Sequence, residues 1–444
     1  MKRVFPLPAI ALAILIGLGL TGPASHAEEA NKEKIPSELG DYVGRDDPTF
    51  AWEIKEKLQR SEGRVWRVEL TSQKWQGIVW KHVLNIHEPK RLEYPQYVLL
   101  SITGGNTGQP AGEESIQRGL RLAQLSGARV AVLHQVPNQP LMGNYREDDL
   151  ITETWLRYLE SGDANWPLLF PMVKSAVRAM DAVEAVAKQE WNGSVAGFVV
   201  SGGSKRGWTS WLTAAADQRV IAIAPMVIDM LNMRAQMKYQ LETWGKPSEM
   251  IASYTRKGLA KTEDQTPRDT QLRRMMDPYS YRSILTMPKL LIQGTNDRYW
   301  VVDAIQLYWD ELIGPKYVLK VPNAGHGLEG GGSLVPNTLA AFFRHVVEKT
   351  PLPQLQWNQA DRDGELHLSI KSSISPNAAR LWTAQSATKD FRDARWQSQP
   401  LEANKGEFTA GMPKPEQGHI AFFGELQFEM RGQPYSLTTL VWRY

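Results

Sequence analysis

The segment from Phe198 to Trp208 reads FVVSGGSKRGW. It begins inside a short apolar run, residues 195–200, which is typical of a strand buried on both faces. A helical pattern follows over residues 207–216. A serine beside glycines at such a junction of strand and helix is a nucleophile elbow, where residues without a Cβ let the two elements approach closely. The segment therefore predicts Ser204 as a nucleophile.

The elbow pattern is only partly met. Gly202 stands two residues before Ser204, but the position two residues after the serine holds Arg206, and the next glycine is Gly207. A glycine-rich loop that binds an anion at a helix N-terminus has a similar sequence. The rest of the chain has to separate these two interpretations.

Two later loops supply the partners that a nucleophilic serine needs. The run LLIQGTND, residues 290–297, places Asp297 just past an apolar strand, and VPNAGHG, residues 321–327, places His326 past the next one. The chain order serine, acid, histidine, each on a loop after a strand, is that of the α/β-hydrolases. We therefore expect His326 to act as the base and Asp297 to orient its imidazole.

Asp229 is an alternative acid, because it ends the strand that follows the nucleophile helix. It also has a structural role open to it, since its carboxylate is placed to cap a helix beginning near Leu231. Asp297 is preferred because its loop follows the strand directly before the one that leads to His326.

An oxyanion hole needs two preorganised donors. In this fold one is the backbone N–H of the residue after the nucleophile, here Lys205, and the other comes from an early loop between strand and helix. The loop TGGN, residues 103–106, is in that place, and Gly105 is the expected donor, with Gly104 and Asn106 as alternatives. A plain turn without a catalytic role also fits this loop.

Strand and helix patterns alternate through most of the chain, which indicates a mainly parallel, doubly wound α/β sheet. The expected strands are residues 65–70, 78–86, 97–103, 128–133, 195–200, 220–228, 289–293 and 317–321. The expected helices are residues 115–125, 168–188 and 207–216.

The chain divides into three predicted parts after an N-terminal leader. Residues 28–350 form the α/β-hydrolase domain, and within it residues 229–287 are helical and amphipathic, as expected of a cap over the carboxyl ends of the strands. After a linker with two prolines, residues 351–444 alternate short strand-like runs with turns, which predicts a β-sandwich-like domain. This domain holds none of the candidate residues, so we expect its removal to leave hydrolysis of a small ester intact.

The N-terminus predicts export. Lys2 and Arg3 precede an apolar run, and Ser25-His26-Ala27 has the small residues of a cleavage site, so residues 1–27 read as a signal peptide cleaved after Ala27. No later segment is apolar enough over the roughly 20 residues that span a bilayer. The chain of 444 residues has no cysteine, which suits a bacterial periplasm or secretion.

Charge and motifs exclude several classes of protein. Cleavage removes two cations and no acid, so the formal charge falls by two, from +3 to +1, and no basic stripe marks a nucleic-acid surface. No Walker, dinucleotide or zinc-protease motif occurs, so no cofactor is expected. His82 and His87 have no third ligand nearby, which argues against a metal site, and His134 is expected as a satisfied interior histidine.

The sequence resembles the PhoPQ-activated pathogenicity-related protein family, a bacterial envelope family with eukaryotic members. The matching stretches are ITGG at 102–105, SGGSKRG at 201–207, IDMLN at 228–232, DPY at 277–279 and PNAGH at 322–326. The resemblance implies a hydrolase fold and a link to virulence or to resistance against antimicrobial peptides. The G-x-S-[KR]-x-G arrangement also looks like that of glucuronoyl esterases, which implies a second oxyanion donor in the Lys205 side chain.

Three functions are compatible with these patterns. The first is an exported serine hydrolase that cleaves an ester or amide through an acyl-enzyme on Ser204. The second is a peptidase for short peptides, since a cap and an added domain restrict entry to the site. The third is an inactive binding protein on a hydrolase scaffold. The substrate is a small molecule or peptide in the first two cases.

Overall fold

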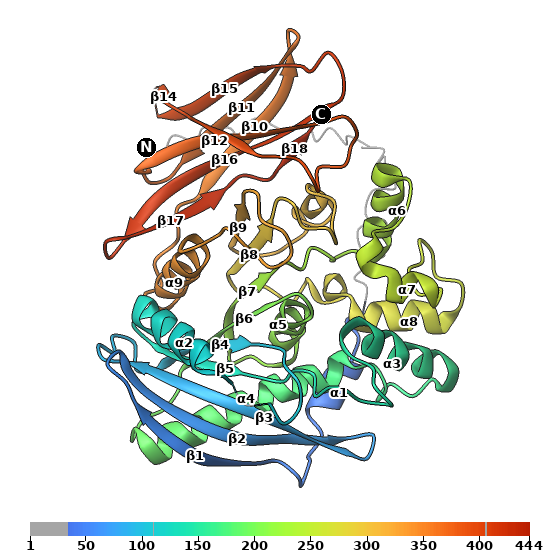
Figure 1. Ribbon diagram of the computed structural model, residues 1–444, viewed down its shortest axis with the longest axis vertical. Helices are drawn as coiled ribbons and strands as arrows, with labels where there is room; N and C mark the ends of the chain where they lie inside the picture. The colour runs from blue at the N-terminus through green and yellow to red at the C-terminus, as the bar shows by residue number, and fades with distance from the viewer. Residues whose placement is uncertain (1–33, 110, 405) are drawn as a thin grey trace, which may run out of the picture. The chain divides into compact units, whose positions relative to one another are not determined.

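The computed structural model describes residues 34–444 except 110 and 405 (Figure 1). The predicted signal peptide, residues 1–27, lies outside the described residues. The chain divides into the units Met1–Ile35 and Pro36–Tyr444, and the described helices and strands all belong to the second unit. Among the described residues, no helix combines the length and the apolar character that crossing a membrane requires.

A nine-stranded sheet, in the order β1-β2-β3-β5-β4-β6-β7-β8-β9, forms the centre of the molecule. In this order the pairs between β5 and β9 are parallel, whereas the pairs β1·β2, β2·β3 and β3·β5 are antiparallel. This topology is the predicted α/β-hydrolase fold. The strands are β1 (Ala51–Gln59), β2 (Gly63–Trp75), β3 (Ile78–Pro89), β4 (Tyr97–Ile102), β5 (Arg129–Leu133), β6 (Gly197–Gly203), β7 (Val220–Met226), β8 (Lys289–Gly294) and β9 (Lys316–Val321).

Strand β1 was not predicted from the sequence. It is an edge strand whose side chains are mostly exposed on both faces, and it alternates charged with apolar residues in the run AWEIKEKLQ. The alternation is short and is broken by the charged run Lys55-Glu56-Lys57, so it did not identify a strand.

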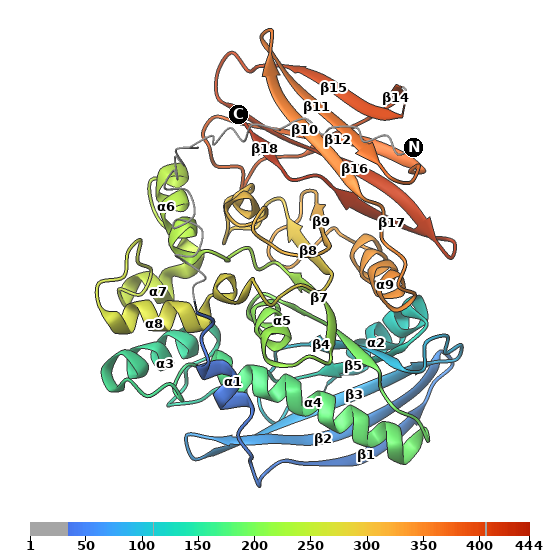
Figure 2. The ribbon, with the colours of Figure 1, turned by 180° about the vertical axis from the view of Figure 1, so that it is seen from behind.

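Two groups of helices pack around this sheet. Helix α2 (Glu113–Ser126) contacts α9 (Leu334–Val347), and α4 (Leu169–Glu190) contacts α1 (Glu38–Val43) and α5 (Lys205–Ala216). Figure 2 shows α4 lying across β2 and β3. The predicted helices at 115–125, 168–188 and 207–216 are thus present with slightly different ends.

The cap segment, residues 229–287, is helical as predicted. It contains α6 (Met233–Trp244), α7 (Ala252–Arg256) and α8 (Pro267–Met276). A helix that the sequence analysis missed, α3 (Glu147–Ser161), contacts α7 and α8. The cap is therefore built from two separate parts of the chain.

The C-terminal strands form two antiparallel sheets, β10-β11-β15-β14 and β13-β12-β16-β17, with β18 paired to β16. Leu368 of one sheet and Leu381 and Phe422 of the other share a buried core cluster with Leu319 and Phe342 of the hydrolase part. The strands are β10 (Leu355–Arg362), β11 (Glu365–Ser372), β12 (Ala378–Ser386), β13 (Gln397–Pro400), β14 (Ala403–Asn404), β15 (Glu407–Pro413), β16 (His419–Met430), β17 (Gln433–Thr438) and β18 (Trp442–Arg443). The sequence patterns of residues 419–423 and 425–430, which predict two short strands, both belong to the single long strand β16. The domain boundary at residue 351 stays a prediction.

Candidate functional site

Ser204 stands on a strained turn between β6 and α5. Its backbone has φ 56° and ψ −127°, a conformation that costs a residue with a side chain free energy and marks functional turns. A Cβ on Gly202 would lie 2.7 Å from the Arg206 carbonyl oxygen, and one on Gly207 would lie 2.7 Å from Ile228 Cγ2. Both glycines are therefore required for the close approach of helix and strands at the elbow.

The structure brings Ser204, His326 and Asp297 together in one hydrogen-bonded chain. Ser204 Oγ lies 2.8 Å from His326 Nε2, and His326 Nδ1 lies 2.8 Å from Asp297 Oδ2. The acid follows β8 and the histidine follows β9, and these neighbouring parallel strands present their loops at one edge of the sheet. The Asp297 side chain is 5% exposed and that of His326 is 27% exposed, so a substrate or solvent molecule can contact the histidine, whereas the acid is buried.

Tyr299 supports the hydrogen-bonded arrangement of Ser204, His326 and Asp297. This role of Tyr299 was not predicted from the sequence. Its backbone N–H donates to Asp297 Oδ1 at 2.9 Å, and its ring lies 4.2 Å from the His326 ring, centroid to centroid. The only sequence feature that could have pointed to Tyr299 is its position two residues after Asp297, from which a backbone N–H can reach the carboxylate. The second carboxylate oxygen is thus occupied, and the imidazole has an aromatic wall.

The alternative acid, Asp229, lies in a different environment. It is buried, accepts a hydrogen bond from the Tyr308 hydroxyl at 2.6 Å and lies 3.8 Å from the Lys320 ammonium. Burial raises the pKa of Asp229, and it lowers the pKa of Lys320. Among the described residues, the His326 ring is hydrogen-bonded through Nε2 to the Ser204 hydroxyl and through Nδ1 to the Asp297 carboxylate, and no hydrogen bond joins it to Asp229.

The helix-capping role expected for Asp229 is wrong. Helix α6 begins at Met233, and the carboxylate of Asp277 accepts the backbone N–H groups of Asn232 and Met233 at 3.2 and 2.8 Å. Burial raises the pKa of Asp277 to about 6, although these N–H groups favour its charged form. A residue 45 positions away in the chain caps this helix, so the local sequence carried no signal for it.

Lys205 is the first residue of α5, so its backbone N–H has no acceptor within the helix. Its ammonium is 3.2 Å from Asp148 Oδ2 and 3.4 Å from Glu147 Oε2. Gly105 has φ +123° and lies in the loop after β4, and β4 pairs with β6 up to Gly202. The expected oxyanion loop and the elbow therefore leave the sheet side by side.

Arg206 explains why the elbow lacks its usual glycine. Its guanidinium is buried and donates to the Val136 carbonyl at 2.6 Å and to both Glu147 oxygens at 2.8 and 2.6 Å. Burial opposes ionisation of Glu147, but Arg206 outweighs it and lowers the pKa of this carboxyl to about 2. The arginine thus anchors α5 to the start of α3.

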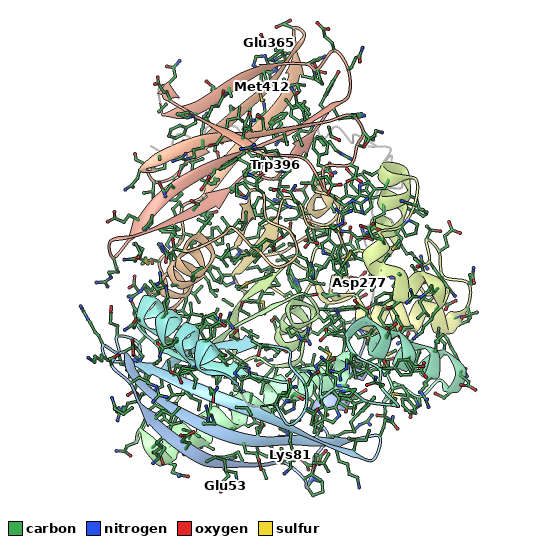
Figure 3. The ribbon with its side chains drawn as sticks, viewed as in Figure 1. Glu53, Lys81, Asp277, Glu365, Trp396 and Met412 are labelled. Carbon is green, nitrogen blue, oxygen red and sulfur yellow. The ribbon has the colours of Figure 1, made fainter. Side chains whose placement is uncertain are left out.

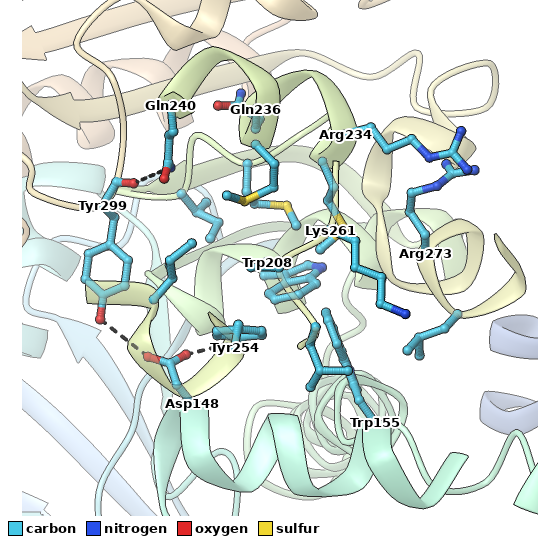
Figure 4. A pocket seen from close by; sticks show the side chains of 18 of the residues that line it. Asp148, Trp155, Trp208, Arg234, Gln236, Gln240, Tyr254, Lys261, Arg273 and Tyr299 are labelled. Atoms are coloured by element: carbon cyan, nitrogen blue, oxygen red, sulfur yellow. Dashed lines mark hydrogen bonds between the residues drawn. The ribbon is translucent and has the colours of Figure 1, made fainter. Parts of the chain in front are cut away.

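A pocket of about 140 Å³ opens beside Ser204, between α3 and the cap segment (Figure 4). Apolar and aromatic side chains dominate its lining, and Asp148, Tyr254 and Tyr299 lie together at one side of it. The Tyr254 and Tyr299 hydroxyls donate to Asp148 at 3.2 and 3.4 Å. The apolar part of the lining includes Trp155, Trp208, Met230, Met233, Met237, Ile251 and Leu272.

The remaining histidines of the hydrolase sheet have interior partners. His82 is 3.0 Å from the Ser72 hydroxyl, His87 is 3.0 Å from the Val130 carbonyl, and His134 is 3.0 Å from the Thr103 hydroxyl. Burial lowers the pKa of each to about 4. Within the described part of the chain, no group of three or more potential metal ligands gathers.

A sequence profile described as PhoPQ-activated pathogenicity-related protein matches residues 39–392. The chain belongs to this family. It is 30% identical over 425 residues to autocrine proliferation repressor protein A of Dictyostelium discoideum, across 88% of this chain and 85% of that protein.

Similar solved structures include esterases of low sequence identity. An acetyl xylan esterase from Paenibacillus sp. R4 has a TM-score of 0.49 and 17% identity, covering 70% of this chain and 92% of its own. Acetyl xylan esterase 1 from Thermoanaerobacterium sp. has a TM-score of 0.47 and 18% sequence identity, and the match covers 69% of this chain and 94% of that protein. A glucuronoyl esterase from Solibacter usitatus has a TM-score of 0.43 and 13% sequence identity, and the match covers 76% of this chain and 98% of that protein.

Proposed function

We propose that the protein is an exported serine hydrolase that cleaves an ester or amide through an acyl-enzyme on Ser204. The observation that carries the proposal is the unbroken chain from Ser204 through His326 to Asp297, with both contacts at 2.8 Å, on a strained elbow. Hydrogen-bond reach between nucleophile and base, with the base held by a third group, is the signature of an activated nucleophile.

Each residue has a defined step in this proposal. His326 Nε2 accepts the Ser204 proton while Oγ attacks the carbonyl carbon, and the imidazolium then gives that proton to the leaving oxygen or nitrogen. Asp297 accepts the Nδ1–H and fixes the tautomer. The backbone N–H of Lys205, together with Gly105, holds the oxyanion. Water repeats the sequence to release the acid from Ser204.

The Lys205 ammonium has a different role in this proposal. Its two carboxylate partners, Asp148 and Glu147, hold it beside the pocket. Its backbone N–H is therefore the oxyanion donor, and its side chain fixes the start of α5 against α3.

The second candidate is a peptidase for short peptides. The observation that favours it is the cap, in which α3 and α6–α8 enclose the space beside Ser204 and so restrict the size of substrate. Cleavage of antimicrobial peptides in the envelope would suit the virulence link that the family name carries. Peptidyl anilides and p-nitrophenyl esters, assayed in parallel, separate the two activities.

A fluorophosphonate probe tests the proposal directly. It should label the wild-type protein at Ser204 and leave Ser204→Ala unlabelled, since only an activated serine attacks phosphorus. A folded wild-type protein that takes up no probe would instead support the inactive binding protein.

A further inference from the structure

Two separate cavities adjoin the candidate site. The position of His326 indicates which cavity takes the acyl side of the substrate and which takes the leaving group. The pocket is lined by Ser204 and Lys205, whereas a separate groove is lined by His326 together with Asn323 and Arg395. Because the protonated base must reach the leaving group, the leaving group occupies the side that His326 lines. The pocket beside Ser204 therefore receives the acyl side of the substrate.

The pocket wall is apolar and adaptable. Trp155 packs edge-on against Trp208 and Tyr254, with ring centroids 5.9 and 5.4 Å apart. The Trp208 indole N–H donates to the Met276 carbonyl at 2.6 Å, so the polar atom of the indole is already satisfied and its carbon atoms supply the apolar lining. Three methionines, at 230, 233 and 237, line the same space, and unbranched thioether side chains adjust to differently shaped apolar groups.

Arg234, Lys261 and Arg273 lie on the side of the pocket opposite Tyr299 (Figure 4), and each is paired with a carboxylate. Lys261 contacts both oxygens of Asp269 at 3.0 Å, and Arg273 lies 3.1 Å from Asp264 Oδ2. Arg234 pairs with the same Asp264 carboxylate. Each of these side chains has a partner of opposite charge, although two arginines share the Asp264 carboxylate. An acidic substrate group would compete with Asp264 for these arginines, and a basic one would compete with the arginines for Asp264, so the lining favours an uncharged group.

The volume of the pocket limits the size of the acyl group that it can hold. An apolar cavity of about 150 Å³ accommodates one benzene molecule, and the pocket here measures about 140 Å³. We propose that the substrate is an ester or amide of a compact, uncharged apolar acid, between butanoyl and hexanoyl or benzoyl in size. This inference rests on the proposed serine hydrolase activity.

A chain-length series of p-nitrophenyl esters tests the inference. Each methylene that enters the pocket should raise kcat/KM about four-fold, so the rate should climb from acetate to hexanoate and fall at decanoate. Met237→Trp fills the pocket and should move the optimum to acetate or propionate, and Met237→Ala should move it to longer acids. Leu241→Trp, on an exposed part of the same helix, is the matched control.

The outcomes separate the two proposals. If a small fluorophosphonate fails to label Ser204, the hydrolase proposal falls and the substrate class falls with it. If Ser204 is labelled but the chain-length profile is flat, or both Met237 variants keep the wild-type profile, the hydrolase proposal stands and the acyl pocket is overturned.

A second, independent observation concerns residues 391–396 of the C-terminal part, here called the clamp segment. Asn296, next to the candidate acid, donates its side-chain N–H to the Ala394 and Arg392 carbonyls at 2.7 and 3.2 Å. Asn323 accepts the Trp396 backbone N–H at 2.8 Å and donates to the Trp396 carbonyl at 3.0 Å. Figure 3 shows Trp396 where the C-terminal strands meet the rest of the molecule.

These contacts join both loops of the candidate site to the C-terminal part. The Asn296 backbone N–H also donates to the Ala324 carbonyl at 2.9 Å, which ties the acid loop to the histidine loop. We infer that the clamp segment positions Asp297 and His326, acting through Asn296 and Asn323. This argues against the expectation that residues 351–444 are dispensable for hydrolysis.

Variants of the full chain test the clamp. Asn296→Ala and Asn323→Ala should each lower kcat ten-fold or more, because a small misplacement of a reacting group is costly. Both side chains also line the groove beside His326, so kcat rather than KM is the readout. Asn323→Asp keeps the acceptor for the Trp396 N–H and should recover part of the loss. Lys389→Ala, an exposed change outside the clamp, is the control. Wild-type kcat in both alanine variants would overturn the inference, and so would a loss that appears in KM alone.

Discussion

Asp297 Oδ2 lies 2.8 Å from His326 Nδ1, whereas the other candidate acid, Asp229, accepts a hydrogen bond from the Tyr308 hydroxyl. Both acids follow core strands and both are buried. Their different partners turn the choice between them into a direct experiment.

Asp297→Asn should lose most of its turnover while it remains folded. An amide cannot hold the imidazole in its working tautomer, and in the chymotrypsin triad the same change lowers kcat about 10⁴-fold. Asp229→Asn should keep kcat within about ten-fold and instead lower the melting temperature, because it leaves the buried Lys320 ammonium without its countercharge. Steady-state kinetics and thermal unfolding of the two variants give the answer. An active Asp297→Asn beside a crippled Asp229→Asn would show that the acid is assigned wrongly.

Lys205→Met should keep most of the activity. Methionine retains the backbone N–H that the oxyanion needs, and the ammonium it removes is engaged with Asp148 and Glu147. We expect kcat within about ten-fold of wild type, against the loss of about 10²-fold or more that results from removal of an oxyanion donor. A loss of that larger size, measured on a p-nitrophenyl ester in a variant with unchanged thermal stability, would assign the side chain to the oxyanion hole.

Much of the arrangement of the candidate site was predictable because its residues stand directly after strands that are easy to recognise. Ser204, Asp297 and His326 each come after a run of buried apolar residues, and parallel strands bring their carboxyl ends to one edge. The fold class was predictable from the same alternation of strand and helix.

The parts that escaped prediction depend on contacts between distant residues. Asn296 reaches a carbonyl 98 positions away, and the Asp277 cap acts across 45 positions, so no local pattern announces either. Helix α3 was missed although it lines the pocket. Its mixed acidic start, EDDLITETW, was not recognised as a helix, and its apolar face is completed only by the cap.

Acid should destabilise the protein through its buried histidines. Burial lowers the pKa of His82 to about 4, so between about pH 4 and 6.5 the imidazole is neutral in the folded state and protonated in the unfolded chain. The unfolded state binds more protons in this window, and stability therefore rises with pH and is lost as pH falls. Thermal unfolding should show a lower melting temperature at about pH 4.5 than at about pH 7. His82→Gln should reduce this slope, and an identical slope in both proteins would contradict the assignment.

Arg206→Lys should destabilise the elbow even though it keeps the charge. The guanidinium makes three hydrogen bonds, to the Val136 carbonyl and to both oxygens of Glu147, in a planar fork that an ammonium cannot reproduce. The loss of charge-assisted hydrogen bonds at a buried site costs about 1.5–3 kcal/mol of the free energy of unfolding. Urea denaturation measures that change. Arg118→Lys, which alters an exposed pair with Glu114 on α2, should change it by less than about 0.5 kcal/mol. Equal effects of the two substitutions would mean that Arg206 does not anchor the nucleophile helix, and the missing glycine of the elbow would then be left without a structural explanation.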